Sequence, residues 1–255
     1  MLFPRIIPVL LVHEKGLVKT VKFKDPKYVG DPINAVKIFN EKEADELTVL
    51  DIDASRHGNE PDYRLIENLA FECRMPLCYG GGIKSVEQAQ KILSLGVEKV
   101  ALSSILFERP EIVTELSERV GSQSVVAVLD VKRKFLSGRY ECYIHNGTVN
   151  TKVCPIEFSK KLQSLGAGEV LINSIDNDGT MSGYDMKIVD SVKSVLKIPL
   201  TVLGGAGSYQ HIESLVSKFP IIGAASGSTF VFKGKYRAVL INYPNVKEKV
   251  LITGG

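Results

Sequence analysis

Glycines and small polar side chains recur together along this chain, each time directly after a short β-branched run. Glycine lets a ligand approach the backbone closely, and the N–H groups at the start of a following helix attract phosphate oxygens. The pattern therefore predicts binding of a phosphorylated small molecule. The residues expected to hold phosphate are Gly82, Ser103 and Ser104 in the first half of the chain, and Asp178, Gly179, Gly205, Ser226 and Gly227 in the second half.

An internal repeat relates these turns to one another. Residues 6–12 align with residues 125–131 at an offset of 119, and the later segments align without a gap at an offset of 123. At the second offset Gly81 pairs with Gly204, and Ser103 pairs with Ser226. The chain is thus two copies of one half, and the duplication predicts one phosphate site in each.

The repeat also shows that one acidic group is missing. Leu11 aligns with Asp130. A carboxylate at both positions could serve as a general acid and base pair, but here one partner is an alkyl group. Further carboxylates, Asp51, Asp53 and Asp176, follow two of the β-branched runs, where either a site role or simple capping of the next helix is open.

Composition and charge limit the class of protein. The 255 residues are 44% apolar and 24% charged, and they carry a net charge of +3 without a long Lys/Arg block. This favours a small anionic ligand over nucleic acid. Prolines and Arg5 interrupt the apolar N-terminal run, so neither a signal peptide nor membrane insertion is expected. The four cysteines form no CxxC pair, which is typical of reduced thiols in a cytoplasmic protein.

The alternation of strand and helix patterns predicts the fold. Eight β-branched runs are expected at 6–12, 46–52, 77–79, 99–102, 124–130, 169–173, 200–203 and 221–223. Helical periodicity is expected at 35–40, 63–72, 86–95, 111–120, 155–165, 184–196 and 209–218. Alternating βα units with a twofold repeat favour a single (β/α)8 barrel domain, α/β in class, over residues 1–255. An open doubly wound sheet is the alternative.

Two segments depart from this alternation. Residues 13–30 are rich in lysine and long enough to form a mobile lid over the mouth of the barrel. Residues 131–153 alternate polar and apolar side chains and contain Asn146-Gly147, a strong hairpin-turn pair. They predict a β-hairpin inserted after the fifth barrel strand.

Over nearly its whole length the sequence resembles the cyclase subunit of imidazole glycerol phosphate synthase. The segments that carry the resemblance include Arg5-Ile6-Ile7, Val18-Lys19, Asp45-Glu46-Leu47, Gly80-Gly81-Gly82-Ile83, Asp130 with Lys132-Arg133, Ser174-Ile175-Asp176-Asn177-Asp178-Gly179-Thr180 and Gly204-Gly205-Ala206-Gly207. That family is a (β/α)8 barrel that receives ammonia from a docked glutaminase and uses it to cleave and cyclise a bisphosphorylated ribonucleotide. The resemblance implies catalytic roles for Asp130 and Lys19, and it implies no metal or other cofactor.

Several positions depart from the family pattern. The second catalytic carboxylate of the family belongs at Leu11, an asparagine of its first phosphate site is Ser103, and a small polar residue is Leu203. The tail at 230–244 also replaces most of the usual eighth helix. Because paired catalytic groups act as a unit, these changes predict that the chain does not cyclise the histidine intermediate.

The tail and the missing aspartate are instead similar to a branch of the family found beside bacterial surface-polysaccharide genes. Members of that branch work with a glutaminase and with an ATP-dependent N-acetyl sugar amidotransferase that makes an acetamidino group. The family's ammonia gate has counterparts at Arg5, Glu46, Lys99 and Glu169, and the glutaminase docking face would include Glu98. A ring of two cations and two anions is expected, either as a gate or as a stabilising ion-pair ring without transport.

Three hypotheses follow from the sequence. The chain is a non-cyclising subunit that passes ammonia toward a sugar-modifying enzyme, or it is a true cyclase in which Asp130 suffices. A third hypothesis makes it a phosphate-sugar binding subunit that signals the presence of substrate to its partner.

Overall fold

The computed structural model describes residues 4–254 and contains a closed barrel of eight parallel strands. Pairing of β7 with β10 closes the ring, so each of the eight barrel strands pairs with a neighbour on both sides. The predicted (β/α)8 barrel is therefore confirmed, and the open-sheet alternative is wrong. In ring order the strands are β1 (Arg5–His13), β4 (Leu47–Asp51), β5 (Leu77–Gly80), β6 (Lys99–Leu102), β7 (Val125–Arg133), β10 (Glu169–Ser174), β11 (Leu200–Leu203) and β12 (Gly223–Ser226).

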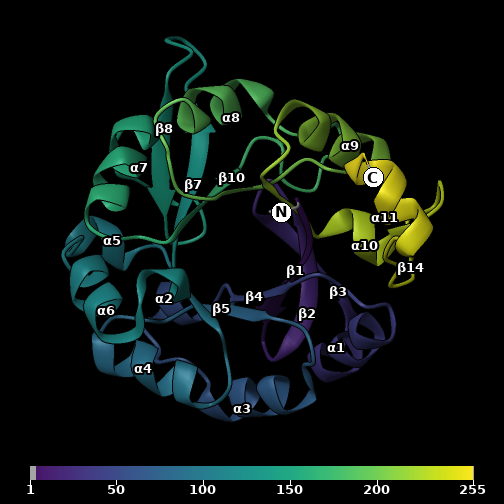
Figure 1. Cartoon of the computed structure of the whole chain (residues 1–255), viewed down its shortest axis with the longest axis horizontal. Helices are drawn as coiled ribbons and strands as arrows, with labels where there is room; N and C mark the ends of the chain where they lie inside the picture. The colour runs from purple at the N-terminus through teal and green to yellow at the C-terminus, as the bar shows by residue number, and fades with distance from the viewer. Residues whose placement is uncertain (1–3, 255) are drawn as a thin grey trace.

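Helices surround the barrel and cover the outer face of its strands (Figure 1). Most of them bury an apolar stripe, as α4 does with Val86, Ala89 and Ile92, whereas α11 buries only Ile252. The outer helices are α1 (Pro32–Glu41), α3 (Tyr63–Glu72), α4 (Val86–Ser94), α6 (Ile112–Val120), α7 (Pro155–Ser164), α8 (Met186–Lys193), α9 (Tyr209–Lys218) and α11 (Val246–Thr253). The connecting segments also contain the short helices α2 (Ala54–His57), α5 (Ile105–Glu108) and α10 (Ser228–Val231) and the 3-10 turn η1 (Ser122–Ser124).

Two hairpins extend the barrel at the carboxyl ends of its strands. β2 (Gly16–Val21) pairs antiparallel with β1, and β3 (Lys24–Gly30) pairs with β2. The segment predicted as a mobile lid is thus a hydrogen-bonded ladder that continues the first barrel strand. After β7, β8 (Tyr140–Ile144) pairs antiparallel with it, and β9 (Val149–Asn150) pairs with β8. The hairpin predicted after the fifth barrel strand is confirmed.

The last βα unit differs most from its sequence prediction. The eighth strand covers Gly223–Ser226 rather than 221–223, because its glycine, alanines and serine give no β-branched signal. The tail contains α10 and the small hairpin of β13 (Phe232–Lys233) and β14 (Ala238–Val239). An eighth outer helix, α11, follows it and lies beside α9 (Figure 1), so the tail precedes this helix and does not replace it.

The apolar core has two parts. The larger lies between strands and helices, and a smaller one fills the inside of the barrel with Ile7, Val9, Val126 and Val128 among its members. The inner residues come from equivalent positions of the two repeated halves, as Ile7 and Val126 do. Within residues 4–254 the four cysteines are unbonded thiols, and no helix combines the length and apolar character needed to cross a bilayer.

Candidate functional site

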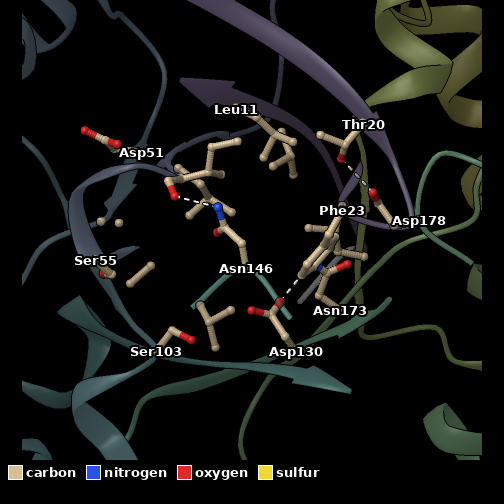
Figure 2. Close-up of a pocket in the computed structure, with 18 of the residues that line it drawn as sticks. Leu11, Thr20, Phe23, Asp51, Ser55, Ser103, Asp130, Asn146, Asn173 and Asp178 are labelled. Carbon is tan, nitrogen blue, oxygen red and sulfur yellow. Dashed lines mark hydrogen bonds between the residues drawn. The ribbon is translucent and has the colours of Figure 1, made fainter. Parts of the chain in front are cut away.

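A cavity of about 220 Å³ opens at the carboxyl ends of the barrel strands, where (β/α)8 enzymes place their active sites. Side chains from both repeated halves and from both hairpins line it, as Figure 2 shows. The cavity brings together all of the predicted catalytic and phosphate-binding residues: Lys19, Gly82, Ser103, Ser104, Asp130, Asp178, Gly179, Gly205, Ser226 and Gly227.

Asp130 is the carboxylate on the inner face of β7 that lines this cavity. Asn173 of the neighbouring strand β10 donates a hydrogen bond through Nδ2 to Asp130 Oδ1 at 3.0 Å. Burial raises the pKa of Asp130 to about 7, although the hydrogen bond from Asn173 opposes the shift. A carboxyl group that titrates near neutral pH can either accept or donate a proton.

Leu11 lies on the opposite side of the cavity from Asp130 (Figure 2). It is close to Leu50 of β4, with which it pairs in the parallel ladder, and Leu203 of β11 also lines the cavity. These alkyl side chains can neither accept nor donate a proton. The cavity thus has one acid–base side chain at the repeated position and an apolar wall at the other.

Lys19 reaches the cavity from the first hairpin. Its Nζ donates to the carbonyl oxygen of Val9 at 2.5 Å and lies against Gly227, where a Cβ atom would collide with it. Burial lowers the pKa of Lys19 to about 8, although the charge of Asp178 opposes the shift. Lys19 therefore places a titratable cation beside the second predicted phosphate cluster.

The first phosphate cluster, Gly82 with Ser103 and Ser104, lies at the ends of β5 and β6. The Gly82 N–H donates to the hydroxyl of Ser55 at 3.2 Å, so an incoming anion would compete with that hydroxyl. Ser104 immediately precedes α5 and lines the cavity. The cluster has both backbone and hydroxyl donors, as phosphate binding requires.

The second cluster is built at the ends of β10, β11 and β12. Asp178 accepts a hydrogen bond from Thr20 at 2.9 Å, which ties the first hairpin to this side of the barrel. Ser226 lies 2.8 Å from the hydroxyl of Thr229, and its own side chain is buried. Burial raises the pKa of Asp178, with the hydrogen bond from Thr20 opposing the shift. Asp178 holds the first hairpin in place and adds a carboxyl group to this side of the cavity. Gly205 and Gly227 leave their backbone accessible to a ligand.

The three other aspartates considered in the sequence, Asp51, Asp53 and Asp176, accept hydrogen bonds from groups of the protein itself. Asp51 accepts from the N–H groups of Asp53 and Ala54 at 2.9 and 3.0 Å, which fixes the turn into α2. Asp53 binds the imidazole of His13 and the N–H of Glu14, and Asp176 accepts from the N–H of Arg133. These contacts favour the structural interpretation of the three residues, although Asp51 also lines the cavity.

At the opposite end of the barrel, four side chains form a closed ring of ion pairs. Arg5 contacts Glu46 and lies 2.7 Å from Glu169, and Lys99 lies 2.8 Å from Glu46 and 3.0 Å from Glu169. Both carboxylates are buried. Burial opposes the charged forms, but the two carboxylates outweigh it and raise the pKa of Arg5 and Lys99. Nearby, Glu98 accepts from the Leu77 N–H at 2.7 Å.

Several cavity residues are not predicted from the sequence. Phe23 and Thr20 come from the first hairpin, and His145 and Asn146 come from the tip of the second. Asn173 could have been found, because it is the polar last residue of the β-branched run at 169–173, where that strand reaches the site. The sequence marks Asn146 only as a turn residue, since nothing local indicates that its side chain reaches across the barrel.

Comparisons with known proteins identify the family. The model of the family described as histidine biosynthesis protein matches residues 5–237. A Vibrio vulnificus protein with the provisional name imidazole glycerol phosphate synthase subunit is 64% identical over 249 residues, which cover 98% of this chain and 96% of that protein. A provisionally named HisF subunit of Leptospira interrogans is 57% identical over 98% of both chains.

A third relative, from Pseudomonas aeruginosa, carries a similar provisional name and is 49% identical over 96% of this chain and 97% of its own length. The span matched by the family model includes all eight barrel strands. The chain therefore belongs to the histidine biosynthesis protein family, among its HisF-like members.

Proposed function

We propose that this chain is the synthase-type subunit of a glutamine amidotransferase complex. In this proposal a HisH-like glutaminase docks at the barrel end that carries the ring of Arg5, Glu46, Lys99 and Glu169, and ammonia passes through the ring toward the cavity. The observation that carries the proposal is the combination of a complete charged ring at one end with an incomplete pair at the other, where Asp130 is present but its repeat counterpart is Leu11.

The interior between the two ends supports passage of an uncharged molecule. This interior is apolar: Ile7, Val9, Val126 and Val128 pack together in it, and Leu11 packs against them next to the cavity. Neutral ammonia crosses such a region at low cost, whereas ammonium loses its hydration there. The arrangement favours delivery of ammonia to the mouth over its consumption by two-group acid–base chemistry within the cavity.

The proposed consumer of the ammonia is an ATP-dependent N-acetyl sugar amidotransferase. It would convert an N-acetyl group of a bacterial surface-polysaccharide sugar into an acetamidino group, in a cytoplasmic step of lipopolysaccharide biosynthesis. The missing carboxylate at Leu11 and the altered residue Leu203 support this assignment, together with the sequence resemblance given above. A phosphorylated small molecule at Ser103 or Gly205 would then occupy the cavity as a substrate or signal.

A second candidate function is that of a genuine cyclase in histidine biosynthesis. It is supported by the provisional names of the relatives and by Asp130, whose pKa near 7 suits proton transfer in either direction. Lys19 would supply a second titratable group, since its pKa is about 8.

One reconstitution separates the two candidates. The chain is mixed with its HisH-like glutaminase and ¹⁵N-amide glutamine, with and without the bisphosphorylated ribonucleotide of the histidine pathway. The main proposal expects the chain to stimulate glutamine hydrolysis and to release labelled ammonia, without forming an imidazole product. Imidazole formation that is lost in Asp130→Asn would establish the cyclase instead. Failure to stimulate the glutaminase would contradict both.

A further inference from the structure

The tip of the β8–β9 hairpin is fastened across the mouth of the barrel. Asn146 donates through Nδ2 to the carbonyl oxygen of Ile52 at 2.7 Å, between residues 94 positions apart. Ile52 follows β4, whereas the hairpin follows β7, three strands further around an eight-stranded ring. The hydrogen bond therefore joins nearly opposite sides of the mouth.

Phe23 of the first hairpin packs against the tip of this crossing segment. A Cβ atom on Gly147 would lie 3.2 Å from both Phe23 and Ile175, so the turn is packed between these side chains. Asn146 and Gly147 have φ angles of 55° and 72°, a left-handed conformation that asparagine and glycine adopt at the least cost. The tip is thus held by contacts on two sides and by its own turn geometry.

The crossing segment also lies between the two phosphate clusters. Figure 2 shows the side chains of Asn146 and Phe23 between Ser103 on one side and Asp178 on the other. Both side chains line the same cavity, whose volume of about 220 Å³ is smaller than the roughly 300–1,000 Å³ typical of ligand sites.

We infer that Asn146 is a specificity-determining residue: its hydrogen bond to Ile52 divides the mouth, so that each phosphate cluster is reached separately. A ligand with one phosphate binds without disturbing the Asn146–Ile52 hydrogen bond. A ligand with phosphates at both ends must break that bond to span the two clusters. The inference rests on the phosphate binding included in the proposed function.

The test compares two ligands on three forms of the full-length protein. Ribose 5-phosphate and ribulose 1,5-bisphosphate are titrated calorimetrically into the wild type, Asn146→Gly and Asn150→Gly. Glycine at 146 preserves the left-handed turn while removing the amide. Asn150 is the matched control, because its amide binds Glu141 within the same hairpin and does not line the cavity.

Asn146→Gly is expected to tighten binding of the bisphosphate about fivefold, which is the usual net effect of one hydrogen bond. Binding of ribose 5-phosphate should change less than twofold in all three proteins, and Asn150→Gly should match the wild type. Equal bisphosphate affinities in the wild type and Asn146→Gly would overturn the inference. An equal gain for both ligands would overturn it as well.

A second measurement does not depend on phosphate binding. Ser103→Cys is introduced together with Cys154→Ser, which removes the exposed native thiol, and its reaction with a trimethylammonium methanethiosulfonate reagent is timed. Adding Asn146→Gly should speed the reaction at least fivefold, whereas Asn150→Gly should not. If neither phosphate ligand binds, the phosphate role is wrong. An unchanged thiol rate would then overturn the role of Asn146, and a faster rate would support it.

Discussion

Asn173 and Asp130 are register partners on β10 and β7, and the amide of Asn173 donates to the carboxyl group of Asp130 at 3.0 Å. Asn173 thereby holds Asp130 toward the cavity. Within residues 4–254 the Oδ1 atom of Asn173 is buried without a hydrogen-bond partner. A buried acceptor without a partner is costly, so Asn173 Oδ1 is available to a hydrogen-bond donor in the cavity.

Stability should depend on pH through Asp130. Its pKa is about 7 in the folded protein and near its ordinary value of 3.8 in the unfolded chain. Between these values the folded state binds the extra proton, so the free energy of unfolding falls as pH rises from about 4 to 7. Asp130→Asn should remove this dependence and be more stable at pH 8 by roughly 1–3 kcal/mol, since a tenfold change in proton affinity is about 1.4 kcal/mol.

Urea unfolding of the wild type and Asp130→Asn at pH 5 and pH 8 measures this effect. Asp190→Asn is the control, because Asp190 is an exposed partner of Lys218. A difference between Asp130→Asn and wild type that is the same at both pH values would contradict the assignment.

Cyclase turnover should be absent from the purified chain even with excess ammonium salt, because Leu11 cannot transfer a proton. Leu11→Asp is expected to restore little activity, since Ser103 and Leu203 also change the cavity wall. Burial of the new carboxyl group should lower the free energy of unfolding by about 1–3 kcal/mol. Product formation is followed by absorbance, with Leu11→Asn as the isosteric control. Robust turnover by the unmodified chain would rule out the non-cyclising function.

Loss of Lys99 from the ion-pair ring should lower the stability of the protein and weaken the coupling between glutamine hydrolysis and ammonia delivery. Lys99→Met leaves Glu46 and Glu169 with Arg5 as their remaining cation, and breaking a buried network costs roughly 3–5 kcal/mol when a charge is left unpaired. Because Arg5 still pairs with both carboxylates, a loss at the lower end of that range is expected. The melting temperature and the ratio of glutamine hydrolysed to ammonia delivered are measured together.

The double variant Lys99→Met with Glu46→Gln removes one cation and one anion from the ring. It should recover part of the lost stability but not the coupling. Recovery of both would mean that the ring only stabilises the fold. Normal coupling in Lys99→Met would contradict passage of ammonia through the ring.

Phosphate affinity should fall as pH rises through about 8, because Lys19 loses its proton there. Burial disfavours the charged form, so between about 8 and its ordinary pKa of 10.5 the unfolded state binds more protons and stability rises with pH. Lys19→Met should bind inorganic phosphate more weakly and remove the pH step centred near 8. Calorimetric titration at pH 7, 8 and 9 measures the step, with the exposed Lys22→Met as the control. An identical step in Lys19→Met would exclude Lys19 from phosphate binding.

The sequence alone was enough to predict the barrel and the glycine and serine residues of the two repeated phosphate clusters. Helical and strand periodicities alternate clearly, and the two halves match at fixed offsets. The correspondence of Leu11 with Asp130 and of Glu46 with Glu169 therefore follows from the order of the residues alone. Most strand boundaries agree within two residues. The predicted eighth strand is displaced because its small residues carry no β-branched signal.

The tertiary structure decided the contacts that cross the barrel. The first hairpin is a ladder on β1 rather than a free lid, Lys19 reaches the Val9 carbonyl, and Asn146 reaches Ile52 from 94 residues away. Each of these hydrogen bonds of Lys19 and Asn146 joins a side chain to a backbone carbonyl of a distant segment. Every residue has such a carbonyl, so the residue type of the acceptor gives no signal in the sequence. Only closure of the ring and the register of its strands bring the two groups together, which is why local sequence patterns could not predict them.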